Sequence, residues 1–453
     1  MGHIEMVEVW KEKVFQLPLM SGVRHYSSNT IIKNGFYGIV EVAIPLVLML
    51  ITTPMFIHKM GTESYGLWTI ALAFLGLIGV FDFGISVAVI KYLSEYYEKN
   101  NLADLSAVVG ISLAISSFVG ILFGTVLFLN SNTLSVIFQS NQISSKQVEL
   151  ILKVISLGLF PMMLQNVGLA IPRGFQDYRI TAIVLLIQNT LTVLFALVIV
   201  LLNGAVLHVM AGTVIMSWIT ACASLYIGWK KMSAVGAKLR VSLKTSKIFF
   251  RYILFMGLSG LGTTIFTMLD RIVIGQVLGL SAAAYYSIAT GVANKFVTLA
   301  SVTTRSLLPA FSSWGVGKDV KKMKAAYIKA TMALGVLILA PGVVFLLFSK
   351  HITVFWLGEK TGTMVLPVMR VLIFIYSTRI IAMPAFHALN GLNFPHITTF
   401  TSLTAGIGAV LLIYLVAPRY GLLGAAWANS AAWISFYMIV FLLVYLNKQE
   451  SRT

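Results

Sequence analysis

Long apolar runs are the feature that most constrains the fold of this 453-residue chain. A bilayer core of about 30 Å is spanned by about 20 apolar residues in a helix. Twelve runs of about that length follow one another with short connections between them. They lie at about 35–57, 66–90, 106–130, 148–171, 178–203, 205–228, 250–272, 282–312, 327–348, 363–387, 396–417 and 421–446. We therefore expect an all-α polytopic membrane protein with twelve transmembrane helices.

The composition supports a membrane protein and excludes several other classes. The chain is 58% hydrophobic and 11% charged, whereas an average soluble domain is about 25% charged. This excludes a soluble enzyme and a disordered protein. The formal net charge of +18 would otherwise suggest nucleic acid, but the basic residues lie between apolar runs, so we expect no nucleic-acid partner. The single cysteine, Cys222, allows no intrachain disulfide.

The basic residues of the loops predict the orientation, because cytoplasmic loops of membrane proteins carry an excess of lysine and arginine. If the amino terminus is cytoplasmic, the cytoplasmic loops hold most of these residues, with dense groups at 229–251 and 318–324. The opposite loops hold only Lys59, Lys146, Arg271, Lys350, Lys360 and Arg419. We therefore expect both termini to be cytoplasmic, as an even number of spans requires.

The chain repeats itself at an offset of about 217 residues, and the starts of the first six runs recur in the last six. Met60-Gly61 corresponds to Leu278-Gly279, Arg173–Gln176 to Asn390–Asn393, and Gly204 to Gly421. Repeats of six spans keep the same orientation. We therefore expect two pseudo-symmetric six-helix bundles related by an axis along the membrane normal.

The repeat divides the chain into five expected segments. These are a cytoplasmic N-terminal tail at 1–34, an N-terminal six-helix bundle at 35–228, a basic cytoplasmic linker at 229–249, a C-terminal six-helix bundle at 250–446 and a cytoplasmic tail at 447–453. Two such bundles enclose a cleft, and rocking one against the other gives alternating access. This architecture predicts a transporter.

Several corners of the chain carry recognisable motifs. They are GTESYGLW at 61–68, FDFG at 81–84 running on into IKYLSEY at 90–96, RGFQ at 173–176, LDR at 269–271, SLLPAFS at 306–312 and LNGL at 389–392. Together they resemble the Wzx-type oligosaccharide flippases, which share a superfamily, MOP, with the lipid II flippase and the MATE drug exporters. The resemblance covers about 35–446.

The resemblance implies a flippase that moves a polyprenyl-diphosphate-linked oligosaccharide from the cytoplasmic to the outer leaflet of the bacterial inner membrane. The oligosaccharide would serve O-antigen or capsule biosynthesis. Membrane lipids, H⁺ or Na⁺ as a coupling ion, and a polysaccharide polymerase with its chain-length machinery are the implied partners. No bond is made or broken, so we expect a transporter, no enzyme activity and no cofactor. The motifs do not identify the glycan.

Basic residues within the spans are candidates for binding the diphosphate. A charged head group needs a wet cationic cleft, and a base within a span costs about 2.5–3.5 kcal/mol on insertion. Lys295 and Arg305, ten residues apart, can face one cavity about 15 Å apart along a helix. Arg370 and Arg379, nine apart, fall on opposite faces, and Arg379 is the deeper. The predicted cleft residues are Lys295, Arg305, Arg379, Lys91 and Lys153.

These bases also have a structural explanation. Long basic side chains reach to the membrane interface with their charged ends, or form internal ion pairs. A cytoplasmic anchor is the favoured explanation for Lys91.

The few acids within the spans are candidates for ion coupling or gating. Asp82 and Glu41 lie in the expected first bundle, and intramembrane carboxylates often mark ion pathways. Asp270 beside Arg271 is typical of a gate or corner ion pair at the outer end. The alternative for Asp82 and Glu41 is a structural role at a helix end.

Uncharged polar and aromatic side chains within the runs have two explanations. Gln165, Asn166 and Asn294 are candidate glycan contacts, but amides also join transmembrane helices. The aromatic residues Trp68, Tyr285, Tyr286, Trp356 and Tyr420 are explained by a belt at the outer interface.

Other chemistry is not indicated. The chain has no phosphate-binding loop of the P-loop type, and its histidines have no metal-ligand spacing, so we expect no metal. A MATE-like cation-coupled antiporter is the main alternative function, but it predicts more acids than bases in the spans. A membrane enzyme of polysaccharide assembly predicts a large extramembrane loop, and the loops at about 131–147 and 349–362 are too short.

Overall fold

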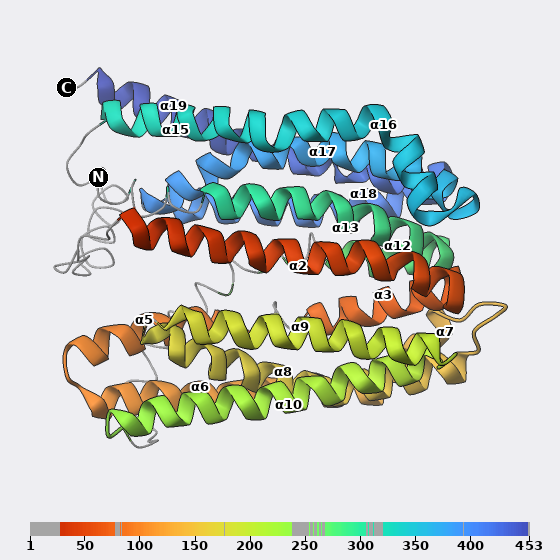
Figure 1. Cartoon of the computed structure of the whole chain (residues 1–453), viewed down its shortest axis with the longest axis horizontal. Coiled ribbons are helices and arrows are strands. Elements are labelled where there is room, and N and C mark those ends of the chain that lie inside the picture. The colour runs from red at the N-terminus through yellow and green to blue at the C-terminus, as the bar shows by residue number, and fades with distance from the viewer. Residues whose placement is uncertain are drawn as a thin grey trace, which may run out of the picture.

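The computed structural model describes residues 28–77, 82, 84–175, 177–237, 253, 257, 261, 264, 268–304, 307, 311, 320–392 and 394–451, with side chains from Ile44 onward except at positions 178, 302, 337 and 341. These residues form helices joined by short turns, and none of them lies in a strand (Figure 1). The expected all-α fold is therefore confirmed for this part of the chain.

The first half of the chain contains α2 (Ser28–Met60), α3 (Thr62–Gly76), α5 (Ile85–Glu98), α6 (Leu102–Leu129), α7 (Ser131–Ile137), α8 (Ser145–Gly174), α9 (Tyr178–Leu201) and α10 (Val206–Ala234). The second half contains α12 (Asp270–Leu278), α13 (Leu280–Thr304), α15 (Val320–Leu334), the π-helix η2 (Gly335–Leu339), α16 (Ala340–Leu357), α17 (Glu359–Gly391), α18 (Pro395–Ala428), the 3₁₀-helix η3 (Asn429–Ser435) and α19 (Phe436–Glu450).

Local sequence signals set several of these helix ends. The Asn101 side chain accepts a hydrogen bond from the Asp104 N–H at the start of α6, and the Asp177 side chain accepts one from Ile180 at the start of α9. Ser144 and Gln147 form a capping box on α8. Such caps satisfy backbone N–H groups that have no partner within the helix.

The helix boundaries follow the offset found in the sequence. Gly61 (φ +81°) separates α2 from α3, and Gly279 (φ +87°) separates α12 from α13. Glycine fits these positions because a positive φ is unfavourable for residues with a Cβ. α8 ends at Gly174 and α17 at Gly391, 217 residues later. The sequence repeat is therefore matched by equivalent helix boundaries in the two halves.

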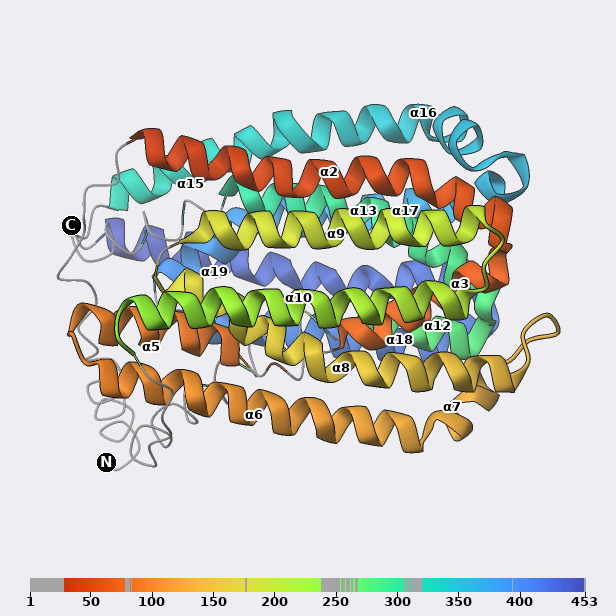
Figure 2. The same ribbon diagram turned by 60° about the horizontal axis from the view of Figure 1, so that its bottom comes forward.

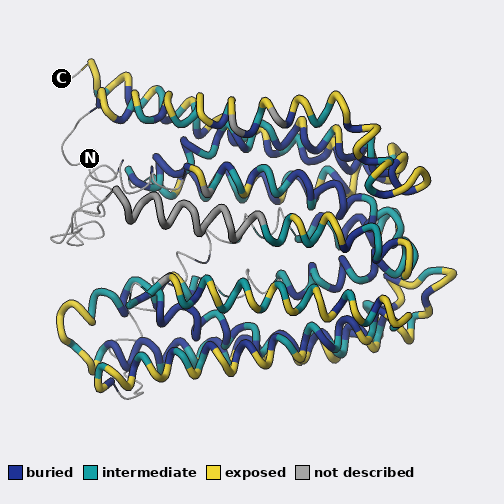
Figure 3. Tube along the Cα trace, viewed as in Figure 1, coloured by how far each residue is buried: buried dark blue, intermediate teal, exposed yellow. Residues whose placement is uncertain are grey.

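The surface of the protein is that of an integral membrane protein. Six helices are long and apolar enough to cross a membrane among the residues described. Large apolar side chains are exposed, including Phe355 at 94%, Leu202 at 76% and Leu347 at 73%. Exposed positions recur along the outward faces of the helices (Figure 3). Lipid is the solvent that such faces require. The total of twelve spans and the sidedness stay predictions.

The corners of the bundle lie at two opposite ends. The turn from α5 to α6, the start of α9 and the ends of α10 and α19 lie at the left of Figures 1 and 2, and the turns after α2, α6 and α16 lie at the right. The principal contacts between the halves join α3 to α12 and α13, and α2 to α13 and α16. At Gly66 of α3, a Cβ would overlap with the backbone of Leu280 in α13.

The structure shows the backbone of three expected spans in detail, and one of them differs from the expectation. The run at 66–90 is interrupted, because α3 ends at Gly76 and α5 begins at Ile85. α17 is continuous although it contains Pro367 and Pro384. α18 is broken by non-helical backbone at Gly421, which is the expected start of the last run. The predicted linker at 229–249 begins within α10, and its residues after 237 lie outside the described part.

Candidate functional site

A buried carboxylate lies at the start of α12. The Asp270 side chain is 2% exposed. One oxygen, Oδ1, accepts a 2.7 Å hydrogen bond from the backbone N–H of Arg271, and the other, Oδ2, accepts one of 2.9 Å from the hydroxyl of Tyr286 in α13. A buried charge is tolerated only when such partners are present.

The hydrogen bonds continue from Tyr286 into two further helices. Asn429 in η3 donates from Nδ2 to the Tyr286 hydroxyl at 2.7 Å, and Tyr376 in α17 donates to Asn429 Oδ1 at 3.4 Å. Tyr286, Tyr376 and Asn429 are at most 1% exposed. The network therefore joins α12, α13, α17 and η3 inside the second half.

Two arginines surround this network. The guanidinium carbon of Arg379 lies 5.6 Å from the ring centroid of Tyr376, a favourable cation–π distance. Arg271 and Arg379 both interact electrostatically with Asp270. The cluster of Asp270, Arg271 and Arg379 thus has two cations for one anion and carries a net positive charge. We refer to these three residues with Tyr286, Tyr376 and Asn429 as the cationic cluster.

Arg271 has spare hydrogen-bonding capacity at the junction between the halves. Its Nε is buried and finds no hydrogen-bond partner within the described part of the chain. Arg271 also lies close enough to Tyr65 of α3 to interact with it electrostatically. An unsatisfied buried donor beside a net positive charge favours an anionic ligand.

The second arginine of α17 points elsewhere. Arg370 donates from Nε to Ser349 Oγ of α16 at 2.8 Å. Arg379 contacts Tyr376, and α17 is one continuous helix between the two arginines. This agrees with the opposite faces predicted from their nine-residue spacing.

A second carboxylate lies in the interruption between α3 and α5. Asp82 Oδ1 accepts a 3.2 Å hydrogen bond from the Ser86 hydroxyl, and its carbonyl accepts one of 2.7 Å from the Ile85 N–H. Gly84, in the left-handed conformation at φ 73°, begins α5. Interrupted backbone at membrane depth is tolerated where it is buried in protein or lines a cavity. The side chain of Glu41 lies outside the described residues.

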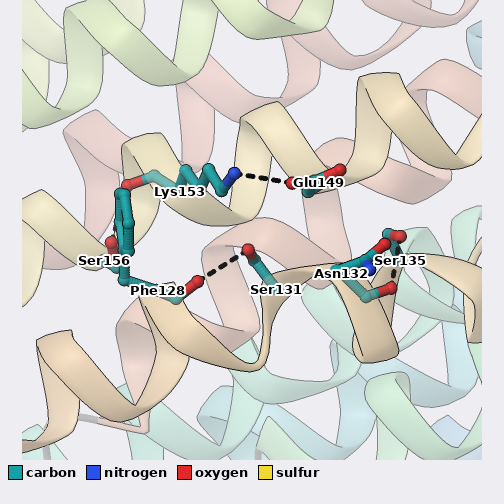
Figure 4. Close-up of polar contacts among 7 residues, drawn as sticks. All are labelled: Phe128, Ser131, Asn132, Ser135, Glu149, Lys153 and Ser156. Carbon is teal, nitrogen blue, oxygen red and sulfur yellow. Dashed lines mark hydrogen bonds and ion pairs between the residues drawn. The ribbon is translucent and has the colours of Figure 1, made fainter.

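Two of the remaining basic candidates lie beside aromatic rings. Lys153 pairs with Glu149 at 2.6 Å on the same helix and lies 5.5 Å from the Phe128 ring centroid (Figure 4). Lys91 lies 4.9 Å from the ring centroid of its neighbour Tyr92. Lys295 is half-buried on α13. Arg305 lies outside the described residues.

The amide candidates differ in their surroundings. Gln165 of α8 donates to Gln188 of α9 at 2.6 Å and accepts from Thr220 of α10 at 3.0 Å. This is the helix-joining role that was the alternative to glycan binding. Asn166 and Asn294 are half-buried.

The described residues contain no group of three or more His, Cys, Asp or Glu side chains that could hold a metal ion.

Sequence reasoning missed the uncharged partners in the cationic cluster. Tyr286 was assigned to an aromatic belt, but the structure buries it completely against Asp270. Tyr376 and Asn429 carried no signal, since single tyrosine and asparagine residues are common in apolar helices. The 16-residue separation of Tyr286 from Asp270 crosses the Gly279 corner, so helical spacing could not relate them.

The chain also matches known proteins. Residues 60–366 match the sequence profile described as "Polysaccharide biosynthesis protein". The chain belongs to the polysaccharide biosynthesis protein family. The motif resemblance is therefore confirmed, and the match includes α3, the α12–α13 corner and the start of α17.

Two relatives of this polysaccharide biosynthesis protein cover most of its length. A Shigella flexneri protein, described as "Putative O-antigen transporter", is 22% identical over 397 residues, which are 88% of this chain and 93% of the relative. An uncharacterized membrane protein of Methanocaldococcus jannaschii is 24% identical over 410 residues, which are 87% of this chain and 79% of the relative.

Solved structures show the same fold. An inward-facing multidrug resistance MATE transporter of the MOP superfamily has a TM-score of 0.74 at 16% identity, covering 91% of this chain and 99% of the transporter. The lipid II flippase MurJ, in an inward closed conformation, has a TM-score of 0.70 at 15% identity, covering 90% of this chain and 87% of MurJ. At these identities the likeness concerns the fold alone.

Proposed function

We propose that this protein is a flippase that moves a polyprenyl-diphosphate-linked oligosaccharide from the cytoplasmic to the outer leaflet. The two halves would rock about the junction formed by α2 and α3 with α12, α13 and α16, giving alternating access. The family and the fold of the solved relatives support a transporter of this kind. Transport breaks no covalent bond, so no catalytic residue is required.

The observation that carries this proposal is the net positive charge of the cationic cluster. The two positive charges of Arg271 and Arg379 outnumber the one negative charge of Asp270 inside an apolar bundle. Guanidinium groups suit phosphate because they donate two parallel hydrogen bonds. We propose that Arg379, together with Lys295 and Arg305, binds the diphosphate, and that Asp270 holds Arg271 and Arg379 in place.

The experiment is to delete the gene in its own host and measure the sidedness of the lipid-linked oligosaccharide. Its glycan is probed with a membrane-impermeant modifying enzyme in spheroplasts and in inverted vesicles. We expect accumulation on the cytoplasmic leaflet, restored to normal by wild type but not by Arg379→Ala or Lys295→Ala. Arg370→Ala is the matched control, because Arg370 lies on the same helix but bonds Ser349.

The outcomes separate the function from the site. Rescue by every variant would keep the flippase and overturn the assignment of Arg379 and Lys295. Normal sidedness in the deletion strain, with redundancy excluded, would contradict the flippase and favour the MATE-like antiporter, for which the fold gives equal support.

The proposed orientation places both termini in the cytoplasm of a bacterial inner membrane. The helix ends at the left of Figure 1 are rich in basic residues: Lys99 follows α5, Lys230 and Lys231 lie near the end of α10, and Lys321 and Lys322 lie at the start of α15. The turns after α2, α6 and α16, at the opposite end, would then face the outside. Contact with a polysaccharide polymerase and its chain-length machinery remains part of the same proposal.

Asp82 is the proposed site of ion coupling, by H⁺ or Na⁺. Its carboxylate lies in an interrupted span, where transporters place coupling-ion sites. We expect Asp82→Asn to retain lipid binding but to abolish the dependence of transport on an imposed ion gradient in proteoliposomes. Transport by this variant that still responds to the gradient would exclude Asp82.

A further inference from the structure

An apolar cavity of about 240 Å³ opens on the surface of the second half. It lies between α13, the η2–α16 segment and α17. Ile338 and Tyr376, each 1% exposed, line its buried part, whereas Val343 and Phe374 are 56% and 55% exposed at its edge. The cavity is therefore a groove that leads from the protein interior to the surface that faces lipid.

The lining of the groove is mostly apolar. Two residues with hydroxyl groups line it, Tyr376 and Ser377. The Ser377 hydroxyl donates to the Phe374 carbonyl at 2.6 Å, and the Tyr376 hydroxyl donates to Asn429. With both donors engaged inside the protein, the lining suits a hydrocarbon chain.

The π-helix forms part of the lining of the groove. Ile338 and Leu339 of η2 line it, and Pro341, which has no N–H for the helical ladder, lies two residues after the end of η2. Single π-helical turns often occur at functional sites. At Gly342, also in the lining, a Cβ would meet no atom within 4 Å. The space beside Gly342 is therefore free.

Tyr376 joins this groove to the cationic cluster. Tyr376 lines the groove, and the centroid of its ring lies 5.6 Å from the guanidinium carbon of Arg379. Tyr376 thus lies between the apolar groove and the positively charged cationic cluster. A molecule with a diphosphate on a long hydrocarbon chain has this same distribution of charge.

We propose that the groove binds a segment of the polyprenyl chain of the transported lipid while its diphosphate lies at the cationic cluster. This proposal rests on the proposed flippase function and adds a binding site for the tail. The exposed edge at Val343 and Phe374 lets the rest of the chain remain in the bilayer. The long tail need not be extracted from the membrane while the head group crosses.

The test compares long-chain and short-chain ligands on the purified full-length protein in phosphatidylglycerol–phosphatidylethanolamine nanodiscs. The long probe is a sugar-free polyprenyl diphosphate with a diazirine in its tail, and the short probe is geranyl diphosphate. Gly342→Phe fills the groove. Gly335→Phe is the matched control, because a Cβ at Gly335 also meets no atom within 4 Å but Gly335 does not line the cavity.

We expect Gly342→Phe to weaken binding of the long probe about tenfold, which corresponds to losing the burial of about two methylene groups. Binding of the short probe should not change, and Gly335→Phe should bind both probes like wild type. In wild type, photolysis should label peptides from α16 or α17. Arg379→Ala should weaken both probes by the same factor.

Three results would overturn the proposal. Equal binding of the long probe by wild type and Gly342→Phe would exclude the groove and leave the flippase intact. Equal labelling by a diazirine phospholipid that the polyprenyl diphosphate does not displace would identify a general lipid site. No binding of either probe to wild type would contradict the proposed function itself.

Discussion

At the scale of single residues, the chemistry of this protein depends on how a buried carboxylate is partnered. The Asp270 carboxylate accepts a hydrogen bond from the Tyr286 hydroxyl, and the oxygen of that hydroxyl accepts a hydrogen bond from Asn429. The Tyr286 hydroxyl therefore provides hydrogen bonds to two neighbouring side chains. Groups of this kind are costly to remove, because both partners are buried and each loses a hydrogen bond.

We expect Tyr286→Phe to destabilise the protein by about 1–3 kcal/mol, the usual cost of leaving a buried polar group unsatisfied. The measurement is thermal unfolding of the detergent-purified protein. Tyr285→Phe is the control, since Tyr285 is the adjacent residue on α13 and lies outside the cationic cluster. Equal unfolding temperatures for wild type and Tyr286→Phe would contradict the importance of this hydroxyl.

At the scale of helices, close approach and corner contacts hold the elements in place. α3 and α13 pack where Gly66 faces the Leu280 backbone. The end of α10 is tied to the α8–α9 corner by the 2.6 Å ion pair between Lys231 and Asp177. The first contact is steric and insensitive to pH, whereas the second depends on ionisation.

Gly66→Ala should cost about 1–3 kcal/mol, the range for overpacking, because its Cβ cannot fit without separating α3 from α13. Thermal unfolding would show this as a lower midpoint. Gly335→Ala, at an open position, should be close to neutral. A neutral Gly66→Ala would mean that the two helices shift apart freely.

The ion pair gives a pH dependence of defined sign. The hydrogen bond from Lys231 lowers the pKa of Asp177 below its ordinary value. The stabilisation is therefore complete above the ordinary pKa and is lost as the pH falls through the lowered pKa. It should amount to less than about 1 kcal/mol, since both side chains are partly exposed. In thermal unfolding near neutral pH, the Lys231→Met variant should have a lower midpoint temperature than wild type. This difference should vanish in acid.

At the scale of the whole molecule, the two halves meet through α2 and α3 at one end of the bundle. Trp356 of α16 donates to the Leu50 carbonyl at 2.6 Å, and Met49 lies against Gly291 of α13, where a Cβ would be 2.7 Å from the Met49 methyl carbon. Alternating access requires this junction to open.

Linking the junction should therefore stop transport. Met49→Cys with Gly291→Cys, in a Cys222→Ser background, would be joined by a short bifunctional maleimide in proteoliposomes. We expect the linked protein to bind polyprenyl diphosphate but to move none across the bilayer, and each single-cysteine protein to remain active. Full transport by the linked protein would show that the halves do not separate here.

The sequence by itself determined the class of the protein, because hydrocarbon thickness and backbone hydrogen bonding leave few solutions for runs of about 20 apolar residues. It also located the repeated glycine corners at Gly61 and Gly279 and the opposite faces of Arg370 and Arg379, since helical periodicity is a local property. Only the tertiary structure decided what surrounds each buried charge. Tyr286, Asn429 and Tyr376 lie on three separate helical elements, and a fourth carries Asp270. Helix packing, which single-residue spacing does not encode, brings them together.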